Sequence, residues 1–178
     1  MNPVILGYRK LHPEAFVPSY ATLHSACFDI RVCLPAGHRT VDVWTVDNIH
    51  SKSMAFPDEM GDSREGVLQL QRGDRALLPT QLILDIPEGY SVRLHMRSGL
   101  ALKAGLMLSN CEGVIDSDYT QQLFVPVTNT SNTVLRIRHG DRICQGEIVE
   151  RIPVEFFQVG DIGQKGDRTG GFGSTGKA

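Results

Sequence analysis

The sequence lacks long apolar runs and has almost no net charge. No stretch reaches about 18 uninterrupted apolar residues, the length that a membrane-spanning helix needs. With a formal net charge of −2 over 178 residues, the chain has no electrostatic excess of the kind that binds a nucleic-acid duplex or an anionic membrane. A small anionic ligand is not excluded, because its site needs only a few local donors.

The sequence also lacks paired cysteines. None of its four cysteines forms a C-x-x-C pair with histidine partners, which gives a zinc site little support. The first 29 residues carry no basic segment followed by an apolar run, so we expect no signal peptide and a location in the cytoplasm, or in the host cytoplasm if the source is viral. In a reducing cytosol free thiols are expected at Cys27, Cys33, Cys111 and Cys144.

What the sequence does have is many glycines between short apolar stretches, which is typical of turns and short strands. The clearest strand is Tyr90–Arg97, where apolar and polar residues alternate. One short helix is expected at Gly99–Ala104, with Ser98 as its cap. This pattern predicts an all-β barrel or jelly roll. The other expected strands are Val4–Gly7, Ile30–Leu34, Val41–Val46, Val67–Gln71, Arg75–Leu78, Leu82–Ile86, Leu106–Ser109, Leu123–Thr128, Val134–Arg138, Arg142–Glu150 and Val154–Gln158.

Composition divides the chain into one β domain, residues 1–159, and a glycine-rich arm, residues 160–178. Within the domain, the polar segment 38–66 is expected to be an insertion loop or an extra hairpin. An internal echo, VLQLQRGDR at 67–75 and VLRIRHGDR at 134–142, places Gly-Asp after a strand each time. We interpret it as turn chemistry used twice, in preference to two phosphate sites.

The arm combines glycines, one aromatic residue and hydroxyl groups between Gly170 and Gly176. Glycines let backbone N–H groups close around phosphate oxygens, because no Cβ blocks the approach. Phe172 would find a flat partner in a base, Ser174 and Thr175 add donors, and a cation such as Arg168 adds charge. The alternative is a disordered linker, and this mixture of residues favours a ligand site.

Three segments in the domain carry further polar groups. Arg97-Ser98-Gly99 stands at the helix start, where free N–H groups bind anions, although an ordinary cap beside a surface arginine fits equally well. Asn110–Tyr119 (NCEGVIDSDY) offers an amide that matches a pyrimidine edge, a tight hairpin at Gly113, and Asp116 and Asp118 on one strand face; plain hairpin chemistry explains it slightly better. For residues 139–145, a turn followed by a buried strand explains the sequence, and only Gln145 indicates a ligand.

Taken in order, these segments resemble the five motifs of the trimeric dUTPase family. The resemblance covers nearly the whole chain except 38–66, and five motifs in order are far more specific than any one of them. The chain departs from the family pattern at Cys27, Met96 and Gln121, and by one residue in the spacing between Arg168 and the glycine pair. The motifs are similar to Ala26–Ile30, Arg97–Ala101, Gly113–Tyr119, Gly140–Gln145 and Gly170–Gly176.

The family implies a jelly-roll-like β-barrel or sandwich with one short helix, assembled as a homotrimer that shares its active sites between subunits. It also implies Mg²⁺-dependent hydrolysis of dUTP to dUMP and pyrophosphate, by attack of water at the α-phosphate. Such an enzyme lowers dUTP and supplies dUMP for dTTP synthesis. The arm would be flexible and close over the nucleotide, and neither nucleic acid nor a membrane is expected as a partner.

The resemblance also assigns roles by position. Asp116 would orient and deprotonate the attacking water, and Asp29 would reach the Mg²⁺ through water. Tyr119 would pack under the deoxyribose and exclude a 2′-hydroxyl group. Uracil would be bound by Asn110, by the hairpin backbone at Gly113 and Ile115, and by Phe172 as a cover. The phosphates would be bound by four residues of the domain, Arg97, Ser98, Gly99 and Gln145. In the closed arm, the substrate would be contacted by Arg168, Gly173, Ser174 and Thr175.

Two alternatives have specific discriminators. A dCTP deaminase relative would share the fold, but it needs a proton-transferring glutamate at the position of Pro126, and proline transfers no protons. A non-catalytic or regulatory trimer could have kept the scaffold and used 38–66 to bind a partner. Loss of Asp116 or of the glycine arm would favour it, and the sequence has both.

Overall fold

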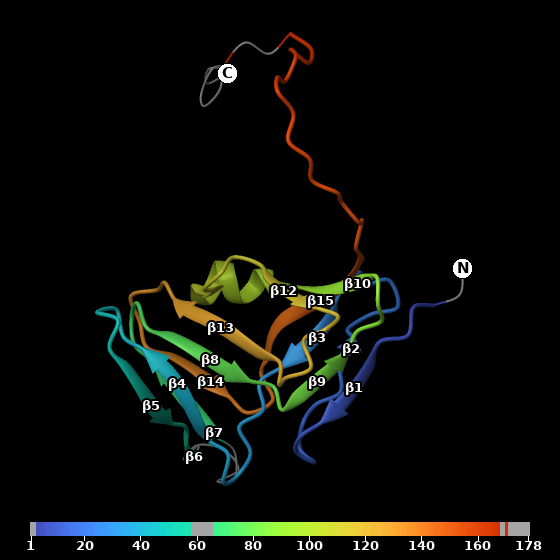
Figure 1. The fold of residues 1–178 in the computed structure, drawn as a ribbon. Helices are drawn as coiled ribbons and strands as arrows, with labels where there is room; N and C mark the ends of the chain where they lie inside the picture. The colour runs from blue at the N-terminus through green and yellow to red at the C-terminus, as the bar shows by residue number, and fades with distance from the viewer. Residues whose placement is uncertain (1–2, 58–65, 168–169, 171–178) are drawn as a thin grey trace.

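The protein is described by a computed structural model that covers residues 3–57, 66–167 and 170. Two five-stranded antiparallel sheets, ordered β12-β10-β15-β3-β2 and β11-β13-β8-β4-β5, pack with two smaller sheets, β14-β7-β6 and β1-β9, around one core (Figure 1). This confirms the all-β, jelly-roll-like class. The strands are β1 (Gly7–Lys10), β2 (Ser19–Tyr20), β3 (Phe28–Arg31), β4 (Thr40–Trp44), β5 (His50–Met54), β6 (Phe56–Pro57), β7 (Gly66–Leu70), β8 (Arg75–Pro79), β9 (Leu82–Asp85), β10 (Tyr90–Met96), β11 (Leu106–Leu108), β12 (Gly113–Asp116), β13 (Phe124–Asn129), β14 (Leu135–Arg138) and β15 (Arg142–Glu150).

The centre of the first sheet is built from β10 and β15. In β10, Val92 and Leu94 are fully buried, whereas Arg93 and His95 on the opposite face remain partly exposed. This alternation confirms the strand that the sequence predicted. Strand β15 pairs with β10 through Cys144–Glu150 and with β3 between Arg142 and Gly146. It therefore connects the segments that carry the first, second and fourth motifs.

The one helix in the described residues is a short π-helical segment, η1 (Leu100–Ala104), which follows β10. It ends at Gly105, whose left-handed φ of 71° closes the last turn. The predicted Ser98 cap is wrong: Gly99 occupies the N-cap position, and the helix has no side-chain cap among the described residues. The described chain contains no helix long and apolar enough to span a membrane.

The two Gly-Asp turns have the same construction. The Asp74 carboxylate accepts a hydrogen bond from the Gln71 backbone N–H at 2.9 Å, and the Asp141 carboxylate accepts one from the Arg138 N–H at 2.8 Å. The glycine before each aspartate has a φ near 80°. The strands that enter these turns, β7 and β14, pair with each other. Turn chemistry used twice is thereby confirmed.

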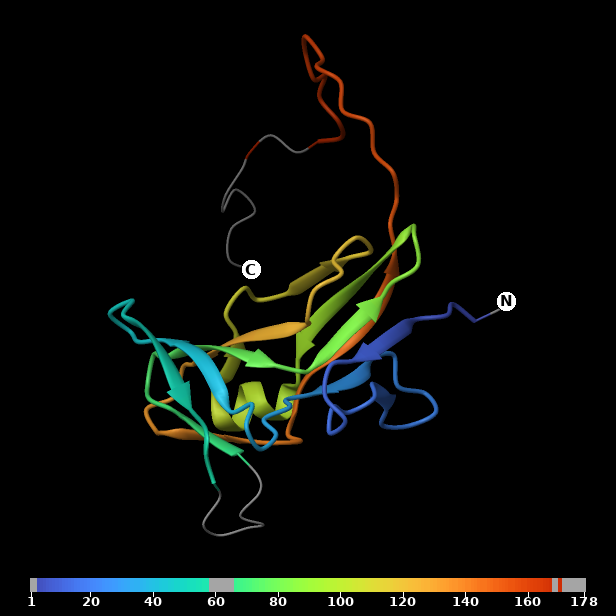
Figure 2. The same ribbon diagram turned by 60° about the horizontal axis from the view of Figure 1, so that its bottom comes forward.

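The predicted insertion pairs with a large sheet, whereas the segment after β15 does not do so in the described chain. Within the predicted insertion, β4 pairs with β8 in the second large sheet and β5 forms the edge of that sheet; residues 58–65 lie outside the described residues. The predicted strand Val154–Gln158 is wrong for a single chain. After β15 the chain leaves the sheets with Phe156 and Phe157 95% and 83% exposed (Figures 1 and 2), because no neighbouring strand in the described chain pairs with it.

We predict that Gly146→Ala destabilises the fold. An alanine Cβ would lie 2.4 Å from the ring of Phe28, its buried register partner on β3. The ring would have to move within a packed core, so we expect a loss of about 1–3 kcal/mol in the free energy of unfolding, measured by chemical denaturation. Gly160→Ala is the matched control, because nothing in the described structure lies within 4 Å of its added Cβ. Equal stability of the two variants would contradict the packing argument.

Candidate functional site

The most constrained polar group in the sheet is the carboxylate of Asp29 on β3, which is only 4% exposed. It accepts a hydrogen bond from Arg142 Nη1 at 3.0 Å and a longer one from Gln145 Nε2 at 3.4 Å. Arg97 Nε lies 3.6 Å from the same carboxylate. A buried carboxylate is stable only with such partners, so Asp29 fixes the positions of all three side chains.

Arg142 belongs to this cluster although sequence reasoning missed it. Arg142 and Gln145 are three positions apart, which would place them on opposite faces of a regular strand. The register of β15 against β3 shifts between Arg142 and Cys144, as in a β-bulge. Ile143 and Cys144 are therefore both buried, and both flanking side chains reach Asp29. The signal in the sequence was a polar pair that brackets two apolar residues.

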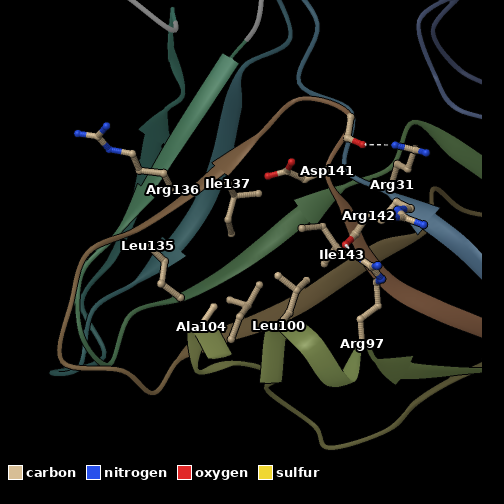
Figure 3. Close-up of a pocket in the computed structure, with 12 residues that line it drawn as sticks. Arg31, Arg97, Leu100, Ala104, Leu135, Arg136, Ile137, Asp141, Arg142 and Ile143 are labelled. Atoms are coloured by element: carbon tan, nitrogen blue, oxygen red, sulfur yellow. Dashed lines mark hydrogen bonds between the residues drawn. The ribbon is translucent and has the colours of Figure 1, made fainter. Parts of the chain in front are cut away.

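The cluster has the composition of an anion-binding surface. Arg97 Nη1 donates to the Arg142 carbonyl oxygen at 3.1 Å, so the two arginines are locked together. Their two positive charges exceed the single charge of Asp29, and planar guanidinium groups match phosphate oxygens. Beside them lies a cavity of about 320 Å³ with an apolar floor that includes Leu100 and Ile143 (Figure 3). Ser98 and Gly99 are exposed next to Arg97.

Cys144 adds no charge to this cluster. Burial, and next the nearby Asp29 carboxylate, raise the pKa of the Cys144 thiol to about 12. Burial also raises the pKa of Cys33 to about 11, and burial followed by Glu147 raises that of Cys27. All four cysteines are free, and Cys111 is the exposed one.

A second group of polar residues surrounds β12, which forms the edge of the first sheet. Asp116 is exposed at the end of β12, opposite Ser91 on β10. Asp116 lines a cleft of about 730 Å³, together with Arg93, Asp118 and Arg151. Asn110 is exposed in the turn at the other end of β12, and Ile115 is half-buried within it.

The geometry around β12 corrects two expectations. Asp116 and Asp118 do not share a strand face, because β12 ends at Asp116 and a turn follows, closed by the Tyr119 N–H on the Asp116 carbonyl oxygen at 3.1 Å. The segment is also no hairpin of paired strands, since β12 pairs with β10 and β11 pairs with β13. The left-handed residue of the turn is Cys111, with φ 63°.

The local structure explains why glycine stands at position 113 and how the ring of Tyr119 is held. A Cβ on Gly113 would lie 3.0 Å from the Leu94 side chain, so this position allows β12 to approach β10 closely. Tyr119 is 39% exposed, and its hydroxyl donates to the Gln122 carbonyl oxygen at 2.9 Å. That bond fixes the ring at the surface, where it presents a flat apolar face.

A single chain does not bring the two groups together. Asp116 lies beside Ser91, and Arg97 lies six positions further along the same strand direction, which corresponds to roughly 20 Å. The cluster at Asp29 and the carboxylate of Asp116 thus lie at opposite ends of β10. The predicted arm residues Arg168, Phe172, Gly173, Ser174 and Thr175 lie outside the described residues.

The same residues could take part in a metal site only through water or a ligand. No group of three or more His, Cys, Asp or Glu side chains in the described chain is arranged to hold a metal ion. Asp29 has both carboxylate oxygens engaged by Arg142 and Gln145, with further lone pairs left for a water molecule. This donor set fits Mg²⁺ bound mainly by a polyphosphate and its waters, which is how Mg²⁺ is usually bound.

The chain is similar in sequence and in fold to known dUTPases. The sequence model of the dUTPase family matches residues 64–176. The deoxyuridine 5′-triphosphate nucleotidohydrolase of Nautilia profundicola is 33% identical over 172 residues, 97% of this chain and 99% of that protein. A variant dUTPase of Staphylococcus bacteriophage 80alpha with dUpNHpp has a TM-score of 0.68 at 21% identity, over 97% of this chain and 98% of its own. A variant dUTPase of phage phi11 of S. aureus, with a structural Mg(II) ion, has a TM-score of 0.66 at 20% identity, over 90% and 99%.

The raised thiol pKa values predict selective labelling. At pH 8 the thiolate fraction of Cys33 and Cys144 is on the order of 10⁻³ to 10⁻⁴, because their pKa values lie at about 11 and 12. With a chromogenic disulfide reagent we expect both to react only after unfolding, whereas the exposed Cys111 reacts in the native protein. Cys111→Ser should remove this rapid phase, and a rapid phase of unchanged amplitude in that variant would contradict the assignment.

Proposed function

This chain belongs to the dUTPase family, and we propose that it hydrolyses dUTP to dUMP and pyrophosphate by attack of water at the α-phosphate. The observation that carries the proposal is the cluster of Arg97, Arg142 and Gln145 around the buried Asp29. It is a preformed anion-binding surface in a chain with this family's sequence. The reaction would lower dUTP and supply dUMP for dTTP synthesis.

The phosphates would bind at the cluster. Arg97 and Gln145 would donate to phosphate oxygens, and Arg142 would keep Asp29 neutralised while it adds positive charge. Ser98 and Gly99 would add donors next to Arg97. Phosphoryl transfer depends mainly on positioning and on stabilisation of developing charge, and side chains already fixed by Asp29 supply both without reorganisation.

The base and the sugar would bind around β12. The amide of Asn110 offers both a donor and an acceptor to uracil, and the backbone at Gly113 and Ile115 would complete that contact. Tyr119 would pack under the deoxyribose, where a 2′-hydroxyl group would collide with its fixed ring. The bond from Tyr119 to Gln122 supports this role, because it limits the ring's freedom to move away.

The chemical step would use Asp116. Its carboxylate would accept a proton from water as the water oxygen bonds to the α-phosphorus. The bond from that phosphorus to the bridging oxygen breaks, pyrophosphate leaves with the electron pair, and the proton passes from Asp116 to solvent. A positioned base contributes on the order of 10²–10⁴-fold. The exposure of Asp116 in the cleft supports the assignment, since water and nucleotide can both reach it.

Mg²⁺ is the cofactor that we propose. When bound to the triphosphate it would neutralise charge on the phosphate oxygens and on the leaving pyrophosphate. Asp29 would contact it through water with the lone pairs left over from Arg142 and Gln145. The dUTPase of phage phi11, which is similar to this chain in fold, coordinates a structural Mg(II) ion.

The active site would be shared between copies in a homotrimer. Asp116 of one copy has to approach Arg97 of another, because about 20 Å separates the two positions within one chain. The exposed, unpaired segment after β15 supports assembly as well, since Phe156 and Phe157 need a covering surface. The arm, residues 160–178, would close over the site with Phe172 on the base, while Arg168, Gly173, Ser174 and Thr175 contact phosphates. The domain boundary and the cytoplasmic location stay predictions.

The rival functions remain weaker. A deaminase would need a proton-transferring side chain at Pro126, which lies within β13. A non-catalytic trimer would have no use for the Asp29 cluster, because a buried carboxylate with two arginines is costly to keep. The β4–β5 hairpin remains available for an additional binding function.

We predict Mg²⁺-dependent release of pyrophosphate from dUTP, and much slower release from dCTP, dTTP and UTP. EDTA should abolish the reaction. Asp116→Asn should lower kcat by about 10²–10⁴-fold and leave dUTP affinity nearly unchanged, because it removes the base but keeps the shape of the site. The measurements are a coupled phosphate assay and calorimetric titration with a non-hydrolysable dUTP analogue.

Asp85→Asn, on the exposed end of β9, is the matched control and should retain full turnover. Wild-type turnover in Asp116→Asn would refute the mechanism. Release from none of the four nucleotides by the wild-type protein would instead favour the non-catalytic trimer.

Complementation between variants tests the shared site. Asp116→Asn and Arg97→Ala should each be nearly inactive alone. After joint refolding at equal amounts, random assembly should place wild-type Asp116 and wild-type Arg97 together in about a quarter of the sites. We therefore expect about a quarter of wild-type activity in the mixture, and no recovery would show that both residues act within one chain.

A further inference from the structure

Arg31 on β3 is a second possible partner for the Asp29 carboxylate. The two residues are two positions apart on the strand, so both side chains leave the same face, roughly 7 Å apart, which is within the reach of an arginine. Arg31 is also the register partner of Arg142, and both line the cavity beside the cluster (Figure 3). Like charges in opposite positions repel each other, and of the two arginines it is Arg142 that donates to Asp29.

Two contacts turn Arg31 away from the carboxylate. Its Nη1 donates a hydrogen bond to the Gly140 carbonyl oxygen at 2.7 Å, and its guanidinium carbon lies 5.6 Å from the centre of the Phe16 ring. The quadrupole of an aromatic ring attracts a guanidinium group at this distance. The ring and the carbonyl oxygen therefore keep the positive charge of Arg31 beside the Gly-Asp turn.

The Phe16 ring, in the loop between β1 and β2, is itself held by its neighbours. It packs against the His139 ring with centroids 5.1 Å apart, and His139 Nδ1 accepts a hydrogen bond from the Leu34 N–H at 2.9 Å. A Cβ on Gly140 would lie 3.1 Å from Phe16 Cζ, so the backbone of the turn contacts the edge of the ring. The preceding residue, Ala15, is buried. The ring is thus fixed between the turn and Arg31.

We propose that Phe16 is a positioning residue for the phosphate cluster: its ring holds Arg31 away from Asp29, so that Arg142 remains the partner of that carboxylate. The consequence for turnover rests on the proposed function, because it takes the cluster to bind the phosphates of dUTP. The competition of two arginines for one carboxylate is independent of that function.

Loss of the ring would release Arg31 toward Asp29. An ion pair between these two would displace the side chain of Arg142, which would no longer be fixed next to Arg97. An anion that binds there would have to order the displaced side chain again, so its affinity would fall. The proton transfer assigned to Asp116 would change little, because Asp116 lies at the other end of β10.

The first experiment measures the affinity of the cluster by calorimetric titration with inorganic pyrophosphate and with a non-hydrolysable dUTP analogue, each with Mg²⁺. Phe16→Leu keeps an apolar side chain but has no quadrupole. We expect its Kd for both ligands to rise about tenfold, while kcat for dUTP changes by less than about threefold. Phe16→Met, which fills the space with a flexible apolar chain, replaces it if Phe16→Leu does not fold.

Two control variants separate the ring from a general effect of substitution. Phe16→Tyr keeps an aromatic face over Arg31 and should bind both ligands like the wild type. Leu23→Ala removes a side chain that is 92% exposed in the loop between β2 and β3, and it should also bind like the wild type. A Phe16→Leu variant with wild-type affinity would overturn the proposal.

Removal of Arg31 in the same chain distinguishes competition from lost packing. In the double variant Phe16→Leu, Arg31→Met the competitor is absent, so its Kd should equal that of Arg31→Met alone. Such non-additivity is the sign that two residues act through one interaction. A defect of Phe16→Leu that simply adds to that of Arg31→Met would show a packing role and would refute the positioning role.

The crystal structure of Phe16→Leu separates this inference from the proposed function. Arg31 within hydrogen-bond distance of Asp29, in a protein that releases no pyrophosphate from dUTP, would keep the inference and refute the function. Full turnover of dUTP by the wild type, with Arg31 still on the Gly140 carbonyl oxygen in Phe16→Leu, would keep the function and refute the inference.

Discussion

The buried carboxylate of Asp29 is the constraint on which the arrangement of the site depends. A carboxylate in the interior of a sheet has to be neutralised and fully hydrogen-bonded. Two side chains of β15 and Arg97, which follows β10, converge on it for that reason. The relative positions of β3, β10 and β15 at this point therefore depend on the Asp29 carboxylate. Because two arginines converge where one charge needs balancing, a positive excess remains for an anion.

The second constraint is the position of β12 at the edge of its sheet. An edge strand has one open side, and here that side carries Asp116, far from the anion-binding cluster. Within one chain the fold thus holds Asp116 and the Asp29 cluster apart, and the proposed reaction would need a second copy to bring them together. Under the proposed function, assembly would be a condition for chemistry, so mutations at the subunit contact would affect turnover without touching the substrate.

The sequence predicted the strands in which apolar and polar residues clearly alternate, and it predicted the Gly-Asp turns. Both signals are local. It failed where a distant partner decides the outcome. Arg142 joins the site only through a bulge against β3, Cys111 takes the left-handed position in the turn before β12, and Val154–Gln158 has apolar character but no strand to pair with. The family motifs include residues of both polar groups, whereas the separation of these groups within one chain follows only from the strand register.

The bulge at the start of β15 also limits how this site can be transferred to another protein. Side chains three positions apart share a face on a helix, and here they do so on a strand, because an extra residue interrupts the alternation. A designer who grafts Arg-x-x-Gln onto a regular strand would send one ligand into the core of the new scaffold. The irregular backbone and the Asp29 carboxylate must be copied together, because the motif Arg-x-x-Gln alone does not specify this geometry.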